Sequence, residues 1–185
     1  MSEEDGNSSK DGSFKMTTGN GHFGQGEYFI SPSRGQREFS QVIDDVIEFV
    51  TEDELCGYKV IVGTDSEQNG SIHTADFVSV IVVHRVGKHG RYFWKRNKSI
   101  KTFDRHDRIL KEASFSLDLA QRVVAELRIK LNERLYDFEI NLDIGQNGPT
   151  KSMIQEIVGM ITGNGFTARI KPDSYAANKV ADRHV

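Results

Sequence analysis

The chain has 185 residues, a formal net charge of −3 at pH 7 and one cysteine. This length predicts one domain with a tail rather than two domains. No run approaches the roughly 18 apolar residues that a membrane span needs, and the acidic start MSEEDGNSSK is unlike a secretory signal, so we expect no membrane partner. Because Cys56 alone cannot form an internal disulfide, a reducing cytoplasm is the expected location.

Residues 1–28 are rich in glycine, serine, asparagine and charged side chains. This segment offers too little apolar surface to offset the entropy cost of ordering it, so it is predicted to be a disordered tail. Residues 29–185 form a normal domain length and can bury a core.

The first half of this domain is predicted to be one helix and three strands. Apolar side chains at helical spacing predict an amphipathic helix over residues 36–52. Strands rich in β-branched residues are expected at 58–65, 74–86 and 91–100. Short turns at Asn69-Gly70 and at GKHG separate them, which predicts an antiparallel meander of three strands.

The second half alternates helices with strands. A long amphipathic helix is predicted over 109–134, followed by a strand at 138–144 and a helix at 149–161. A strand at 166–171 and a last helix capped by Asp173 or Ser174 complete the chain. These elements predict an α/β protein with a five-stranded mixed sheet, in which two parallel strands join the meander, and with an additional helix at the N-terminal side.

Two similar hexapeptides follow predicted strands: DSEQNG begins at Asp65 and DIGQNG at Asp143. Asp and Asn-Gly are also common turn residues, which is the simpler explanation. Ligands of α/β proteins bind at the ends of neighbouring parallel strands, however. If these two strands are neighbours, both carboxylates open onto one crevice.

Two further acids can be placed on helices. Glu112 is expected in the first turn of the long helix, about 70° from the centre of its apolar side, where the alternative role is favourable charge at a helix N-terminus. Asp182 lies on the last helix and could equally be a surface residue. Four carboxylates close together require cations to stay ionised, and oxygen ligands suit Mg²⁺ or Mn²⁺. Two such ions about 4 Å apart suit phosphodiester hydrolysis.

The element order and these acids resemble the ribonuclease H-like superfamily. More narrowly, the chain is similar to the YkuK-type family of predicted ribonuclease H-like proteins over about residues 29–185. The segments that carry this resemblance are GTDS, IVVHRVGKHGRYFW, DIGQNGPTK and IKPDSYAANKVADRH.

The resemblance implies a nuclease that uses two divalent ions, with nucleic acid (RNA, DNA or a hybrid) as its partner. It implies that Asp65 bridges two Mg²⁺ ions, that Glu112 and Asp143 help to hold one, and that Asp182 holds the other. The chain departs from many ribonucleases H in two ways. It has no histidine in the loop before the last helix, near residues 171–174, and it ends three residues after Asp182.

Substrate contacts are predicted along RYFWKRNKSIKTFDRHDRILK, which has eight Lys or Arg residues against two Asp, with aromatic residues interleaved. Basic groups neutralise phosphates and aromatic rings stack on bases. An ordinary strand with one buried and one solvated face is the alternative. Lys151, after the second hexapeptide, either reaches a phosphate or stays in solvent. The predicted nucleic-acid contacts are Arg91, Trp94, Lys95, Arg96, Lys98, Lys101 and Lys151.

Two other functions stay open. A nucleic-acid-binding module could keep this fold without catalysis, which the absent loop histidine and the short last helix favour. A nucleotide-binding protein of the sugar-kinase and actin type shares this sheet topology. DSEQNG lacks the Gly-Gly-Thr expected there, and the chain is too short for two such halves.

Overall fold

The computed structural model describes residues 27–70, 73–131, 133–145, 151–174 and 176–185. Its seven strands form one mixed sheet in the order β2-β1-β5-β4-β3-β6-β7. The strands are β1 (Tyr28–Ser31), β2 (Gly35–Glu38), β3 (Tyr58–Asn69), β4 (Thr74–Arg85), β5 (Gly90–Lys101), β6 (Tyr136–Asn141) and β7 (Thr167–Arg169). The helices are α1 (Phe39–Thr51), α2 (Arg105–Lys130), the 3-10 turn η1 (Glu133–Leu135), α3 (Lys151–Gly163) and α4 (Ala176–Ala181).

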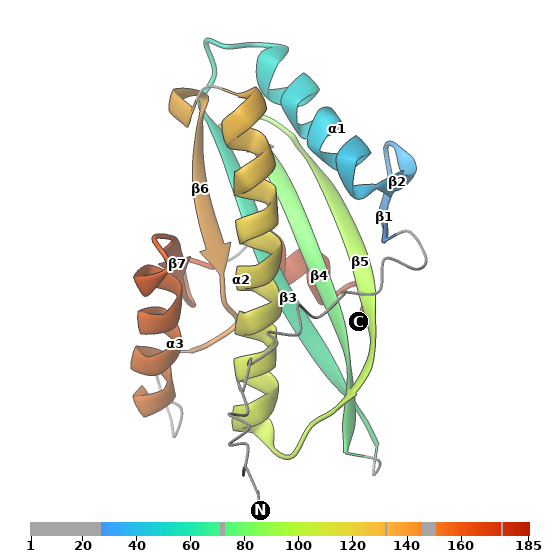
Figure 1. Cartoon of the computed structure of the whole chain (residues 1–185), viewed down its shortest axis with the longest axis vertical. Helices are drawn as coiled ribbons and strands as arrows, with labels where there is room; N and C mark the ends of the chain where they lie inside the picture. The colour runs from blue at the N-terminus through green and yellow to red at the C-terminus, as the bar shows by residue number, and fades with distance from the viewer. Residues whose placement is uncertain (1–26, 71–72, 132, 146–150, 175) are drawn as a thin grey trace, which may run out of the picture.

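Helices cover the sheet on both faces. Figure 1 shows the long helix α2 crossing one face and α4 lying behind the sheet. The larger core lies under α1, α2 and α3 and includes Val60 and Val62 of β3. The smaller core joins α4 to alternate residues of the strands, such as Ile61 and Val80. This alternation follows from the two-residue repeat of a strand, so each residue of β3 can be assigned to one helical layer.

The predicted mixed α/β sheet is confirmed, although the predicted number of strands is wrong. The meander is β3-β4-β5, and β6 and β7 continue the sheet in parallel beside β3. The two additional strands, β1 and β2, form a hairpin that pairs with β5 at Ile30 and Trp94. Each has four residues, and β2 is polar and mostly exposed, so neither carries the apolar alternation that reveals a strand.

The N-terminal boundary lies slightly earlier than predicted. β1 begins at Tyr28, and Glu27 forms ion pairs with Lys95 and Arg122. Burial alone would raise the pKa of Glu27, but the hydrogen bonds and charges of Arg122 and Lys95 outweigh it and lower this pKa to about 2. The rest of the predicted tail, residues 1–26, lies outside the described residues.

Helix α2 begins four residues before its predicted start. The Asp104 side chain accepts a hydrogen bond of 2.8 Å from the backbone N–H of Asp107, which caps the helix at Arg105. Glu112 is therefore about two turns into the helix, not in its first turn as predicted. The helix dipole acts mainly within the first turn, so it does not explain the position of Glu112.

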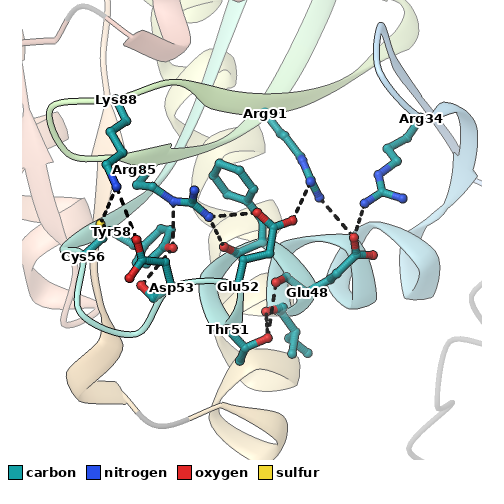
Figure 2. A network of polar contacts seen from close by, with 12 residues as sticks. Arg34, Glu48, Thr51, Glu52, Asp53, Cys56, Tyr58, Arg85, Lys88 and Arg91 are labelled. Carbon is teal, nitrogen blue, oxygen red and sulfur yellow. Dashed lines mark hydrogen bonds and ion pairs between the residues drawn. The ribbon is translucent and has the colours of Figure 1, made fainter.

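A buried arginine ties the end of α1 to the start of the meander. Arg85 donates to the Tyr58 hydroxyl (2.8 Å), to the Phe49 carbonyl (3.2 Å) and to Glu52 (2.8 Å). Figure 2 shows this network, in which Lys88 and Arg91 reach neighbouring acids of the same region. No helix among the described residues is long and apolar enough to cross a membrane.

Candidate functional site

Asp65 and Asp143 occupy equivalent positions relative to the paired parallel segments of β3 and β6. β3 and β6 pair from Tyr58 with Tyr136 as far as Gly63 with Asn141. Asp65 and Asp143 each follow two residues after that last pair. Asp65 is still held in β3 by its pairing with Val78 of β4, whereas β6 has ended. The prediction that these two strands are neighbours is confirmed. Both acids lie near the end of β6.

Helix α4 brings Asp182 to the same face of the sheet as Asp65. Gly63 permits this close approach, because a Cβ atom there would lie 2.8 Å from Cβ of Ala177. Asn178 donates hydrogen bonds of 3.0 Å to the carbonyl and the hydroxyl oxygen of Ser174, and Ser174 Oγ donates to the Leu142 carbonyl at 2.8 Å. α4 is thereby fixed to the segment that leads to Asp143. Asp182 immediately follows this helix and is exposed.

Glu112 approaches from α2, on the other face of the sheet. It is buried, with 6% of its surface exposed, and accepts a hydrogen bond of 2.5 Å from Ser66 Oγ. Ser66 follows Asp65 in β3, so its side chain points to the α2 face while that of Asp65 points to the α4 face. Burial raises the pKa of Glu112 to about 7, and the negative charges of Asp65 and Asp143 add to this rise.

The four acids Asp65, Glu112, Asp143 and Asp182, here called the acidic cluster, share one electrostatic environment. Burial raises the pKa of Asp65, and the charges of Asp143 and Asp182 raise it further. A hydrogen bond of 2.8 Å from the Ser66 N–H to Asp65 opposes this rise. Negative charge is therefore concentrated where α2, β3, β6 and α4 meet.

Two cations that were not predicted lie within this environment. Arg108 donates to the Ser66 carbonyl at 2.7 Å, and its charge acts on both Asp65 and Glu112. Lys171 Nζ lies 2.5 Å from Asp143 Oδ1, and this contact raises the pKa of Lys171. Arg108 precedes Glu112 by four residues, a helical spacing that places both on one side of α2 and could have indicated it. Nothing in the sequence indicates Lys171.

The cluster does not form a ready-made metal site. Within the described part of the chain, no group of three or more His, Cys, Asp or Glu side chains is placed to hold a metal ion. Glu112 is bound to Ser66 and Asp143 to Lys171. The donor chemistry, four carboxylates, is nevertheless the type that Mg²⁺ and Mn²⁺ prefer.

The predicted nucleic-acid contacts of β5 are divided between the two faces of the sheet. On the α1 and α2 face, Arg91 pairs with Glu52 at 2.7 Å and Lys95 pairs with Glu27. On the α4 face, Trp94 stacks on the ring of His184 with centroids 4.2 Å apart, and Arg96 donates to the His184 carbonyl at 2.6 Å. These residues therefore do not form one continuous surface.

The remaining predicted contacts are less informative. Lys101 ends β5 and lies 5.3 Å from the centre of the Phe103 ring. Lys98 belongs to β5 and Lys151 begins α3, but their side chains lie outside the described part of the structure. Nucleic-acid contact by any of these residues stays a prediction.

His184 is the histidine nearest in sequence to the last acid of the cluster. It packs against Trp94 and Tyr92 of β5, and burial lowers its pKa. Its stacking partner places it beside the sheet face that α4 covers. It lies after α4, not in the loop before it, and its ring stacks on aromatic residues that border the smaller core.

Comparison with known proteins agrees with this architecture. The family model described as "Ribonuclease H-like" matches residues 41–185. The chain is 31% identical over 166 residues to "Uncharacterized protein YkuK" of Bacillus subtilis (strain 168), an alignment that covers 84% of this chain and 95% of the relative. No solved structure matches at a significant level. The chain therefore belongs to the YkuK-type family of ribonuclease H-like proteins.

Proposed function

We propose that this protein is a divalent-metal-dependent nuclease that hydrolyses phosphodiester bonds of RNA, DNA or a hybrid. The observation that carries the proposal is the equivalent placement of Asp65 and Asp143 past the last pair of β3 and β6. Asp65 lies in β3 and Glu112 in α2, whereas Asp143 follows β6 and Asp182 follows α4. The ribonuclease H-like family match supports a role with nucleic acid.

The donor set fits a site for Mg²⁺ or Mn²⁺. Asp65, Glu112, Asp143 and Asp182 would hold the ions. Bound ions would supply a water of lowered pKa and positive charge for the leaving oxygen. Burial, and after it the charges of Asp143 and Asp182, raise the pKa of Asp65, and a bound cation would relieve both the desolvation and the repulsion.

Neighbouring residues position these acids. The Ser66 N–H holds Asp65, and the Ser66 hydroxyl holds Glu112, so one residue orients two acids from opposite faces of β3. Arg108 fixes the Ser66 carbonyl and brings a positive charge close to the same acids. Burial raises the pKa of Glu112 to about 7, so this carboxyl holds a proton at a higher pH than an exposed glutamate does. Metal binding would therefore release protons.

Cleavage assays test the proposal. The purified protein should cut at least one of single-stranded RNA, an RNA–DNA hybrid and branched DNA in Mg²⁺ or Mn²⁺. Asp65→Asn should abolish cleavage with the fold intact, as judged by circular dichroism. Asp118→Asn is a matched control. Asp118 lies on the exposed side of α2, so its substitution should leave activity unchanged. Cleavage that persists in Asp65→Asn would place the activity elsewhere.

A non-catalytic nucleic-acid-binding module is the second candidate. The observation that favours it is the state of the acidic cluster, in which Lys171 already neutralises Asp143 and no three of the described acids form a metal group. Binding of nucleic acid without cleavage of any substrate in either metal would decide for this second function.

A further inference from the structure

Lys171 is the cation placed most directly within the acidic cluster. It lies between β7 and α4, and its backbone N–H donates to the Ile144 carbonyl at 3.1 Å. That bond fixes its backbone beside the segment that follows Asp143. Its ammonium lies 2.5 Å from Asp143 Oδ1 and is also within the influence of Asp65 and Asp182. The charges of three of the four acids thus act on this one ammonium, which contacts Asp143.

We propose that Lys171 holds Asp143 in the metal-free protein and moves to a substrate phosphate when a divalent cation binds Asp143. This inference rests on the proposed function, since it takes Asp143 as a metal ligand. A divalent ion and an ammonium would compete for Asp143 Oδ1 and would repel each other at such short range. Metal binding should therefore displace the ammonium from the carboxylate.

The structure makes this displacement feasible. The Lys171 side chain is 55% exposed, so solvent surrounds much of its flexible stem. Arg108, the other cation of the site, is tied to the Ser66 carbonyl instead of to an acid. A lysine ammonium binds phosphate well as a point charge. An ammonium released beside the metal ions would lie where the scissile phosphate must bind.

Two binding measurements test the exchange. Isothermal titration with Mn²⁺, without nucleic acid, should show that Lys171→Met binds the metal roughly two- to fivefold more tightly, the factor that a solvent-exposed ion pair is worth. In Ca²⁺, as a non-catalytic ion, Lys171→Met should bind a single-stranded oligonucleotide more weakly. The slope of log K against log salt concentration should become shallower, by the amount expected for the loss of about one phosphate contact.

Two further variants serve as controls. Lys171→Arg keeps the charge, so its Mn²⁺ affinity should stay close to that of the wild type. Lys130→Met removes a comparable Lys–Asp pair, with Asp44 at 3.1 Å, at the other end of the long helix α2. It should change neither Mn²⁺ affinity nor oligonucleotide binding.

The outcomes separate this inference from the proposed function. If the wild type binds Mn²⁺ and Lys171→Met binds it equally or more weakly, the exchange is wrong and the nuclease proposal stands. If Lys171→Met binds Mn²⁺ more tightly but binds the oligonucleotide as the wild type does, Lys171 does not move to a substrate phosphate. If neither protein binds Mn²⁺ or Mg²⁺, the metal site itself fails and the inference fails with it.

Discussion

Ser66 Oγ lies 2.5 Å from Glu112 Oε1 and joins β3 to α2 at the buried side of the acidic cluster. This hydrogen bond lowers the pKa of Glu112, but burial and the charges of Asp65 and Asp143 outweigh it. Glu112 is thus a buried carboxyl whose pKa of about 7 lies close to physiological pH.

In the metal-free protein, the contribution of Glu112 to stability should therefore decrease as pH rises from about 4.5 to about 7. The folded state binds a proton at Glu112 more tightly than the unfolded chain does, because its pKa rises from 4.5 to about 7 on folding. Between these values the folded protein holds more protons, so the free energy of unfolding falls with increasing pH. Glu112→Gln should remove this term and raise stability at pH 8 by up to about 3 kcal/mol.

Urea denaturation in a metal chelator at pH 5, 6, 7 and 8 measures this effect. Glu126→Gln is the control, because Glu126 lies on the same helix with 44% of its side chain exposed. Its profile should follow that of the wild type. Equal pH profiles for Glu112→Gln and the wild type would mean that Glu112 does not titrate with a raised pKa.

A methyl group at Gly63 should destabilise the fold and disturb α4. The added Cβ would lie 2.8 Å from Cβ of Ala177 and 3.1 Å from the Asn141 carbonyl oxygen, which leaves no room for it. Overpacking of this kind costs about 1–3 kcal/mol. Urea denaturation of Gly63→Ala should show that loss, and cleavage activity should fall because Asp182 directly follows α4.

Gly159 provides a control of opposite sign. It lies inside α3, and a Cβ atom added there would meet no described atom within 4 Å outside its own helical turn. Gly159→Ala should therefore stabilise the protein by roughly 0.5–1 kcal/mol through helix propensity. If Gly63→Ala is as stable as the wild type, α4 does not pack on β3 as closely as described.

Much of this arrangement could be predicted from the sequence because it depends on local periodicity. The apolar repeats located the meander, the long helix and the two parallel strands. The similar hexapeptides place Asp65 and Asp143 at one edge only if the strands before them are neighbours, and the parallel pairing of β3 with β6 meets that condition. The angular position of Glu112 beside the apolar side of α2 indicated its burial.

Other features depend on contacts between distant segments, which no local pattern records. The β1–β2 hairpin is held by its pairing with β5, and Lys171 reaches Asp143 across a loop. The basic stretch of β5 has neighbouring residues on both faces of the sheet, because a strand alternates its faces. Arg91 and Trp94 therefore point to opposite sides, and their partners, Glu52 and His184, come from distant segments that the sequence pattern does not identify.

Loss of Arg85 should destabilise the protein strongly without a direct effect on the acidic cluster. Arg85 is 8% exposed, and its guanidinium lies 4.6 Å from the centre of the Phe49 ring and 2.8 Å from Glu52. Its removal would take away a hydrogen-bond partner of the Tyr58 hydroxyl and of the Phe49 carbonyl together with the packing on the Phe49 ring, so a clear loss of stability is expected. Thermal and urea denaturation of Arg85→Ala should show this loss (Figure 2).

Lys88 supplies the matched comparison in the same network. Its side chain is 51% exposed and pairs with Asp53 at 3.3 Å. An exposed ion pair contributes about 0–1 kcal/mol, so Lys88→Ala should be close to the wild type in stability. Similar losses in the two variants would show that burial of Arg85 is not what makes its network stabilising.

Divalent cations should stabilise the folded protein through the acidic cluster, and Asp65→Asn should reverse the order of stabilities. In a chelator the variant should have the higher melting temperature, because it removes one of the charges that repel Asp143 and Asp182. In Mn²⁺ the wild type should gain stability with metal concentration, whereas the variant should gain little, since only binding to the folded state raises the melting temperature.

The stabilisation of the wild type by Mn²⁺ should be larger at pH 8 than at pH 6, because protons compete with the metal for Glu112. Thermal unfolding across Mn²⁺ concentrations at both pH values checks all three expectations, and Asp118→Asn should behave as the wild type throughout. A variant that Mn²⁺ stabilises as much as it does the wild type would exclude Asp65 as a metal ligand.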